Sequence, residues 1–198
     1  MATSEPRRST LGMLLLALLM EAPMHPYRMQ QMIKERGQDQ LVNVAQRNSV
    51  YQALDRLVRD GLARPAGTAR DRGRPERTVY EITDAGAETM QRWLTAMLPA
   101  PAREFPEFPA ALAFLAALDP ETVRELLTRR IAAQQQRLTA IEEQAPPDLH
   151  RLFLIEDEYR AAMLRAELAW LRALVDDLAT GRLAWPRFVA GESPAHAG

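Results

Sequence analysis

One amphipathic stretch, RNSVYQALDRLVRDGL at residues 47–62, restricts the possible folds of this chain more than any other feature. Val50, Leu54, Leu57 and Val58 recur at the spacing of one helical face, and Gly61 is a residue type that often ends a helix. The opposite side carries polar and charged side chains, namely Asn48, Gln52, Asp55, Arg56 and Arg59. The pattern predicts a helix that packs through one side and presents a polar side to solvent or to a partner.

Two short strands are predicted directly after this helix, with a basic loop between them. Residues 62–65 and 78–83 have strand composition, and the second segment, TVYEIT, alternates between its two faces. The loop concentrates arginine around Gly73, at Arg70, Arg72 and Arg74. Either these side chains contact a polyanion, or they form a solvated loop paired with Asp71 and Glu76.

Three more helices complete the first half of the chain, at about residues 10–20, 26–36 and 84–98. Proline begins the second of them and Gly37 follows it, while Thr83 or Asp84 can cap the last. The resulting order is helix, helix, helix, strand, basic loop, strand, helix. This is the order of a winged helix-turn-helix.

The first of these helices is the segment most easily misread, because a basic start and an apolar run resemble a secretory signal. The run from Leu11 to Met20 is too short to span a bilayer. Glu21 and Pro23 follow it without a cleavage motif of small residues. A helix that is apolar on nearly all sides is therefore predicted to be buried in a core, and no membrane association is expected.

A winged helix-turn-helix would bind double-stranded DNA by base contacts and phosphate contacts. The helix at 47–62 is then the recognition helix, whose first turn faces base edges in the major groove, while the loop follows the backbone or enters the minor groove. The candidate DNA-binding residues are Arg47, Asn48, Ser49, Tyr51 and Gln52 at the start of the helix, Arg56 and Arg59 further along it, and Arg70, Arg72 and Arg74 in the wing.

Composition agrees with this hypothesis and excludes several others. Residues 1–98 carry 14 Arg or Lys and 11 Asp or Glu, whereas residues 99–198 carry 11 and 15, so the first half leans basic. The chain has no cysteine, which excludes disulfides and thiolate sites and favours a cytoplasmic setting. His25, His150 and His196 lie far apart, so neither a metal site nor a cofactor is expected.

Three motifs, HPYRM, SVYQALDRLVRDGL and GRPERTVYEITDAG, resemble the signatures of the PadR-like transcriptional regulators. The recognition-helix pattern of that family is matched by Tyr51, Leu54, Arg56, Leu57, Gly61 and Leu62, and its wing pattern by Tyr80, Ile82, Thr83 and Gly86. The match covers about residues 10–95. The resemblance implies a DNA-binding regulator, usually a repressor, with a helical carboxy-terminal dimerisation domain and, in some members, an aromatic-lined effector pocket.

Two long helical patterns, at residues 120–144 and 148–181, fill the second half. The apolar stripe of the second is too broad for one chain to bury, which predicts a homodimer. Its candidate dimerisation residues are Leu152, Tyr159, Met163, Trp170, Leu171, Leu174 and Leu178. The expected organisation is a winged helix-turn-helix domain at 1–98, a helical domain at 99–190 joined to it through a proline-rich stretch, and a disordered tail at 191–198. The predicted class is thus mainly α with one two-stranded wing.

Three interpretations remain open at this point. The leading one is a homodimeric, ligand-responsive repressor on an inverted-repeat operator, with Trp93 and Trp170 either lining a pocket for a small hydrophobic or aromatic effector or simply packing in cores. The second keeps the winged fold as a protein-interaction module without DNA. The third, a helical enzyme, lacks a nucleophile or pocket partner for its carboxylates, such as the run at 156–158, and no catalytic residue is assigned.

Overall fold

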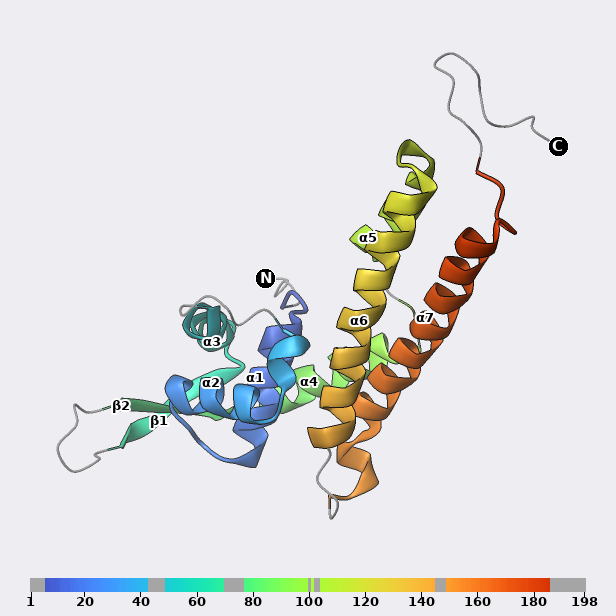
Figure 1. Ribbon diagram of the computed structural model, residues 1–198. Helices are drawn as coiled ribbons and strands as arrows, with labels where there is room; N and C mark the ends of the chain where they lie inside the picture. Colours follow the sequence, from blue (N-terminus) through green and yellow to red (C-terminus); the bar gives the residue numbers. More distant parts are fainter. Residues whose placement is uncertain are drawn as a thin grey trace. The chain divides into compact units, whose positions relative to one another are not determined.

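The computed structural model describes residues 6–42, 49–69, 77–99, 101, 104–144 and 149–185. The chain divides into two compact units, unit 1 at Met1–Arg103 and unit 2 at Glu104–Gly198 (Figure 1). Unit 1 holds α1 (Thr10–Glu21), α2 (Pro26–Glu35), the 3-10 turn η1 (Gln38–Gln40), α3 (Ser49–Arg59), β1 (Ala63–Ala69), β2 (Arg77–Ile82) and α4 (Asp84–Met97). Unit 2 holds α5 (Glu107–Leu112), η2 (Leu115–Ala117), α6 (Pro120–Gln144), η3 (Arg151–Phe153) and α7 (Ile155–Thr180). This mainly helical fold with one two-stranded sheet confirms the predicted class.

Some predicted residues lie outside the described residues. They are Arg47 and Asn48 before α3, the wing-tip residues Arg70, Arg72 and Arg74, and the tail at 191–198.

The core of unit 1 is built around α1, which contacts α3, α4 and β2. Ser9 caps this helix, since its Oγ accepts a hydrogen bond from the Gly12 N–H at 3.2 Å. Leucines on several sides of α1 are at most 3% exposed, at Leu15, Leu16, Leu18 and Leu19. The apolar run is therefore the buried helix that the sequence predicted.

The next two helices form the helix-turn-helix itself. Proline occupies the first position of α2, and His25 caps it by accepting a hydrogen bond from the Tyr27 N–H at its Nδ1, at 3.0 Å. Gly37 follows α2 with a φ of 65°, a conformation that glycine adopts at little cost. The side of α3 that faces the core is lined by Val50, Ala53, Leu54 and Leu57.

The wing is an antiparallel pair in which Ala63 lies opposite Ile82. β1 is longer than the predicted segment at 62–65, because pairing with β2 resumes after a bulge between Pro65 and Gly67. The turn before α2 adds one bridge to β2: Met24 and Tyr80 exchange two backbone hydrogen bonds of 3.0 Å. The helix-turn-helix and the wing are therefore joined through the backbone.

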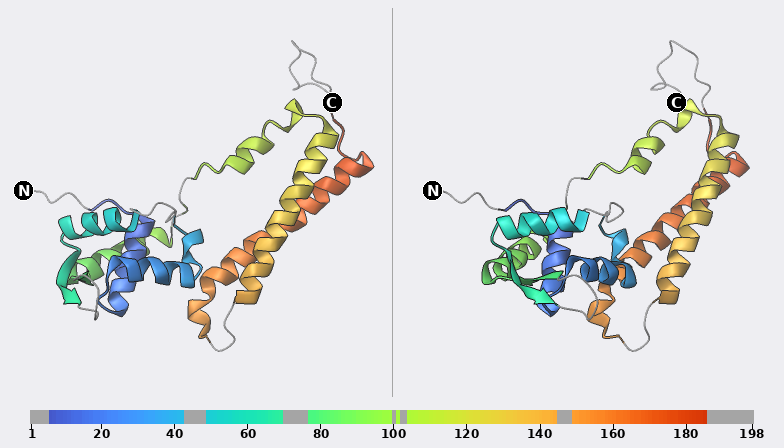
Figure 2. Two further views of the ribbon diagram at one scale, coloured as in Figure 1. Left: turned by 60° about the vertical axis from the view of Figure 1, so that its left-hand side comes forward. Right: turned by 90° about the vertical axis from the view of Figure 1, so that its left-hand side faces the viewer.

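Unit 2 is a long helical hairpin in which α6 and α7 pack along their lengths (Figures 1 and 2). One apolar cluster joins Val123 and Leu127 to Leu171, and a second joins Leu138 to Ala161 and Leu168. Between them, the Glu167 carboxylate accepts hydrogen bonds from Arg130 Nε at 2.7 Å and from Gln134 Nε2 at 2.9 Å. These polar contacts fix the register of the two helices.

Two details of the second half were predicted wrongly. The segment at 148–181 is not one helix, because η3 precedes α7 and His150 Nδ1 accepts a hydrogen bond from the Leu152 N–H at 3.2 Å. The proline-rich stretch at 98–111, predicted as a connection, contains α5. Phe108 of α5 packs on unit 2 and lies under the Arg130 guanidinium, 3.4 Å from ring centroid to Cζ.

Candidate nucleic-acid interface

The uncovered side of α3 carries the described candidate residues. We call Ser49, Tyr51, Gln52, Arg56 and Arg59 the α3 face; Ser49 is half-buried and the other four are exposed. Arg56 Nε donates a hydrogen bond to the Gln52 carbonyl at 3.2 Å, so its guanidinium lies along the helix. The Arg59 side chain is 73% exposed and only 3.8 Å from Asp60. A phenol, an amide and two guanidinium groups thus share one side of a helix, and all of them can hydrogen-bond to bases or phosphates.

The carboxyl end of α3 is held to the start of α4 by what we call the Thr83–Gly86 junction. Thr83 Oγ1 donates a hydrogen bond to the Gly61 carbonyl at 2.7 Å, and the Thr83 N–H donates to the Leu62 carbonyl at 3.1 Å. The same Oγ1 accepts the Gly86 N–H at 3.0 Å, which caps α4. A Cβ at Gly86 would lie 2.1 Å from the Leu62 carbonyl oxygen, so this position requires glycine.

The beginning of α3 has a contact of its own with α2. The rings of His25 and Tyr51 meet edge to face, with centroids 6.4 Å apart. The His25 side chain therefore both caps α2 and contacts the α3 face. Sequence reasoning assigned no role to His25, although the HPYRM motif was a signal that could have found one. It predicted Thr83 or Asp84 as the cap of the last helix of this unit, and the structure shows that Thr83 is the cap. The bond from Thr83 to the Gly61 carbonyl was not predicted.

Electrostatics distinguish the α3 face from the rest of unit 1. Four other arginines form ion pairs with carboxylates, in the pairs Arg28–Glu35, Arg36–Glu21, Arg64–Glu81 and Arg92–Glu88. Hydrogen bonds from the Arg36 guanidinium hold the pKa of Glu21 below its ordinary value. Within the described part of the chain, Arg56 forms no such pair. The Arg56 guanidinium is thus left without a carboxylate partner on the exposed side of α3.

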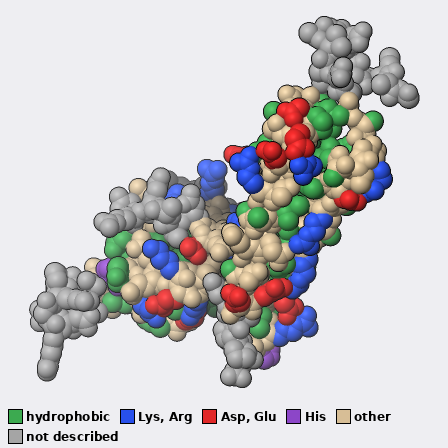
Figure 3. Space-filling view, viewed as in Figure 1, with side chains coloured by type: hydrophobic (Ala, Val, Ile, Leu, Met, Phe, Trp, Pro, Cys, Tyr) green, Lys and Arg blue, Asp and Glu red, His purple; other side chains and the backbone are tan. Residues whose placement is uncertain are grey.

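The candidate dimerisation residues separate into two sets. Leu171 is fully buried, and Leu174 and Leu178 are half-buried, where they pack within the hairpin of their own chain. The other four are 47–65% exposed: Leu152, Tyr159, Met163 and Trp170. Figure 3 shows hydrophobic side chains reaching the surface along unit 2 between charged ones. The outward set, which we call the outer α7 face, is the part available to a second copy.

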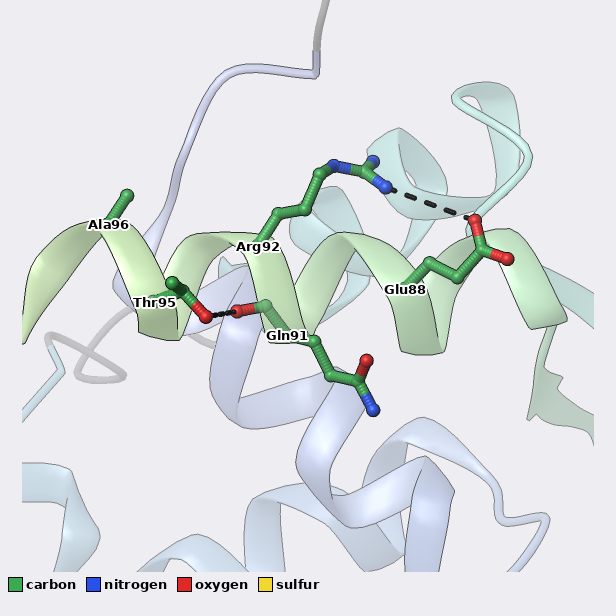
Figure 4. A pocket seen from close by; sticks show the side chains of 5 residues that line it. All are labelled: Glu88, Gln91, Arg92, Thr95 and Ala96. Atoms are coloured by element: carbon green, nitrogen blue, oxygen red, sulfur yellow. Dashed lines mark hydrogen bonds and ion pairs between the residues drawn. The ribbon is translucent and has the colours of Figure 1, made fainter.

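The two tryptophans predicted for an effector pocket belong to different units. Trp93 is 3% exposed and part of the unit 1 core, whereas Trp170 lies on α7 and is 47% exposed. Neither lines the hollow of about 540 Å³ that opens along α4 (Figure 4). Its described lining comes from one helix, at Glu88, Gln91, Arg92, Thr95 and Ala96. A pocket formed by the two tryptophans stays a prediction.

Other kinds of site find little support in the described ranges. They contain no group of three or more His, Asp or Glu side chains that could hold a metal ion. None of their helices is long and apolar enough to cross a bilayer. In the carboxylate run of α7, burial and then the neighbouring Asp157 raise the pKa of Glu156, while the charge of Arg160 and its hydrogen bond to Glu156 oppose that shift.

Unit 1 consists of three helices, a two-stranded wing and a closing helix, and the third helix exposes a polar side. This arrangement defines a winged helix-turn-helix. Comparison with known proteins finds a family model that matches this part of the chain. Residues 15–92 match the Transcriptional regulator PadR-like family, so the chain carries the PadR-like domain that its motifs resemble. Members of that family are transcriptional regulators and not enzymes.

Solved structures resemble the fold over most of the chain. PadR of Bacillus subtilis in complex with operator DNA superposes with a TM-score of 0.71 at 18% identity, covering 86% of this chain and 99% of that one. The same protein with p-coumaric acid gives 0.69 at 17%, with the same coverage. The PadR-like regulator BC1756 of Bacillus cereus gives 0.62 at 16%, covering 88% and 99%. At these identities the likeness shows the fold of both units. No curated protein matches the chain by sequence.

Proposed function

We propose that this PadR-like regulator is a homodimeric, cytoplasmic repressor that binds an inverted-repeat operator in double-stranded DNA. The observation that carries the proposal is the α3 face, where hydrogen-bonding groups and two exposed arginines lie on the one uncovered side of the helix. Tyr51 and Gln52 contact bases, and Arg56 and Arg59 contact phosphates. Arg47 and Asn48 extend the base contacts, and Arg70, Arg72 and Arg74 form the wing contact. The structure of the related Bacillus subtilis PadR with operator DNA supports this assignment.

The outer α7 face supports the proposal of a homodimer. Four large side chains, three on α7 and Leu152 on η3 just before it, are about half exposed or more, although α7 also has a fully buried side. A second copy that covers this face would remove them from water and relate two winged domains by a two-fold axis. The operator would then consist of two inverted half-sites about one helical turn apart.

The proposal includes a small hydrophobic or aromatic effector. Its support is the likeness to Bacillus subtilis PadR, whose structure has been determined with p-coumaric acid. Trp93 and Trp170 are the candidate lining residues. Binding would lower the affinity of the dimer for its operator.

Fluorescence anisotropy tests the proposal directly. The purified protein is titrated onto the duplex immediately upstream of its own gene and onto a scrambled duplex, each at two salt concentrations. We expect tighter binding to the upstream duplex, weakening as salt rises. Gln52→Ala should reduce the preference between the two duplexes, whereas Gln91→Ala, an exposed glutamine on α4, should not. Equally weak, salt-independent binding to both would contradict the proposal and favour a protein-interaction module.

A further inference from the structure

The segment before α1 brings two more arginines to the α3 side of unit 1. Arg7 and Arg8 are exposed, while Pro6 and Ser9 on either side of them are half-buried, so the segment lies against the unit. Residues 6–9 pass along α3 in both views of Figure 2. We call Arg7 and Arg8 the arginine arm.

Local contacts fix where this arm leaves α1. Ser9 is the N-cap of α1, and its carbonyl accepts the Met13 N–H at 2.8 Å in addition to the Gly12 N–H bonded to its Oγ. Gly12 packs against α3, because a Cβ placed on it would lie 3.6 Å from Leu57 Cδ2. The arm therefore starts at the second half of α3, where Arg56 and Arg59 flank Leu57 in sequence.

Charge pairing separates the arginine arm from most other cations of unit 1. Arg28, Arg36, Arg64 and Arg92 are held by carboxylates. Within the described residues, Arg7, Arg8 and Arg56 form no ion pair. Lys34 also lacks one, but it lies in the last turn of α2, where the carbonyl end of the helix favours a cation. Unpaired arginines gathered on one side repel one another unless an anion binds there.

We propose that the arginine arm binds DNA phosphates next to the half-site read by α3. Two guanidinium groups on a surface-lying segment suit the repeated phosphates of a duplex backbone, which they can contact without reading bases. The arm lies outside residues 15–92, the part of the chain that matches the family. This inference rests on the proposed function, since the arm extends the same DNA-binding surface.

The salt dependence of DNA affinity measures this contribution. Full-length protein, Arg7→Ala/Arg8→Ala and Arg7→Lys/Arg8→Lys are titrated onto a mixed-sequence duplex and onto a duplex selected by the unchanged protein from a random pool. Arg129→Ala/Arg165→Ala removes the same charge from unit 2 and is the matched control. Thermal unfolding of the two arm variants is followed in parallel and should not change, because neither arm residue has a partner in the described residues.

The alanine variant should bind both duplexes more weakly and by the same factor. The slope of log affinity against log salt should fall by about 0.9 for each phosphate that the arm no longer neutralises, hence by about 2 for the pair. The lysine variant should keep most of the slope of the unchanged protein, and the unit 2 control should keep the whole slope. An unchanged slope in the alanine variant would overturn the proposal, and a changed preference between the duplexes would overturn its assignment to the backbone. Absence of salt-dependent binding by the unchanged protein would instead refute the proposed function and this inference with it.

Discussion

Replacing Gly86 by alanine tests the Thr83–Gly86 junction, which holds the end of α3 against α4. The new Cβ would lie 2.1 Å from the Leu62 carbonyl oxygen and 2.8 Å from Ile82 Cγ1, whereas ordinary van der Waals contacts begin near 3.4 Å. Backbone must therefore move by more than about 1 Å, a scale at which overpacking costs about 1–3 kcal/mol. The move also weakens the bond from the Thr83 N–H to that carbonyl, at about 1 kcal/mol.

Alanine also has an opposing effect, because it favours a helix over glycine by about 1 kcal/mol. The net expectation for Gly86→Ala is a loss of about 1–3 kcal/mol from the free energy of unfolding of unit 1. Gly12→Ala is the matched control, since it makes the same chemical change in α1 and its Cβ would meet nothing closer than 3.4 Å. That variant should be as stable as the parent or more stable by up to about 1 kcal/mol.

Urea unfolding followed by the fluorescence of Trp93 is the appropriate assay. Trp93 lies in the core of unit 1, so replacing Trp170 and Trp185 of unit 2 by phenylalanine leaves a probe of unit 1 alone. If Gly86→Ala were as stable as the Gly12→Ala control, the close approach to Leu62 would not constrain the fold, and our account of the junction would be refuted.

Three further predictions concern other contacts. Acid should destabilise unit 1 in part through Glu21, because the Arg36 guanidinium holds the pKa of this carboxyl low. The stability contributed by the ionised Glu21 is present above the ordinary carboxylate pKa and is lost as pH falls through the lowered pKa. Glu21→Gln should therefore flatten the pH dependence of urea unfolding. Glu167→Leu leaves the 6%-exposed Gln134 without its acceptor and should cost unit 2 about 1–3 kcal/mol in thermal unfolding; an unchanged melting temperature would show that the contact is dispensable. Trp170→Arg, on the outer α7 face, should shift the mass measured by light scattering from dimer to monomer while circular dichroism stays unchanged; a persistent dimer would exclude this face as its interface.

The parts of the fold that depend on local pattern could be predicted from the sequence. The stripe of Val50, Leu54 and Leu57 placed α3 and its buried side correctly, because a helical period is a property of neighbouring residues. The apolar run at 10–20 became a buried helix for the same reason. The alternation in TVYEIT located β2, which ends at Ile82 as the Thr83 cap requires.

Features that depend on distant partners could not be predicted. The bridge between Met24 and Tyr80 joins two segments whose sequences show no sign of pairing. β1 continues to Ala69 only because β2 is there to pair with it beyond the bulge. In unit 2, apolar spacing continues through residues 149–178, so periodicity alone could not show the break into η3. Exposure was equally unpredictable for Leu171, which the hairpin buries completely.

The junction also limits how the proposed effector would act on DNA binding. Thr83 follows β2, caps α4 and binds the carbonyls of Gly61 and Leu62, so α3, the wing strands and α4 cannot reorient separately without breaking these hydrogen bonds. A ligand that shifts α4 is therefore expected to move the α3 face and the wing as one body. In the proposed dimer, such a movement would change how well the two halves fit two half-sites, but it would leave the base contacts of each half intact. Lower affinity with an unchanged preference between duplexes is then the expected effector response, and a changed preference would require the junction to open.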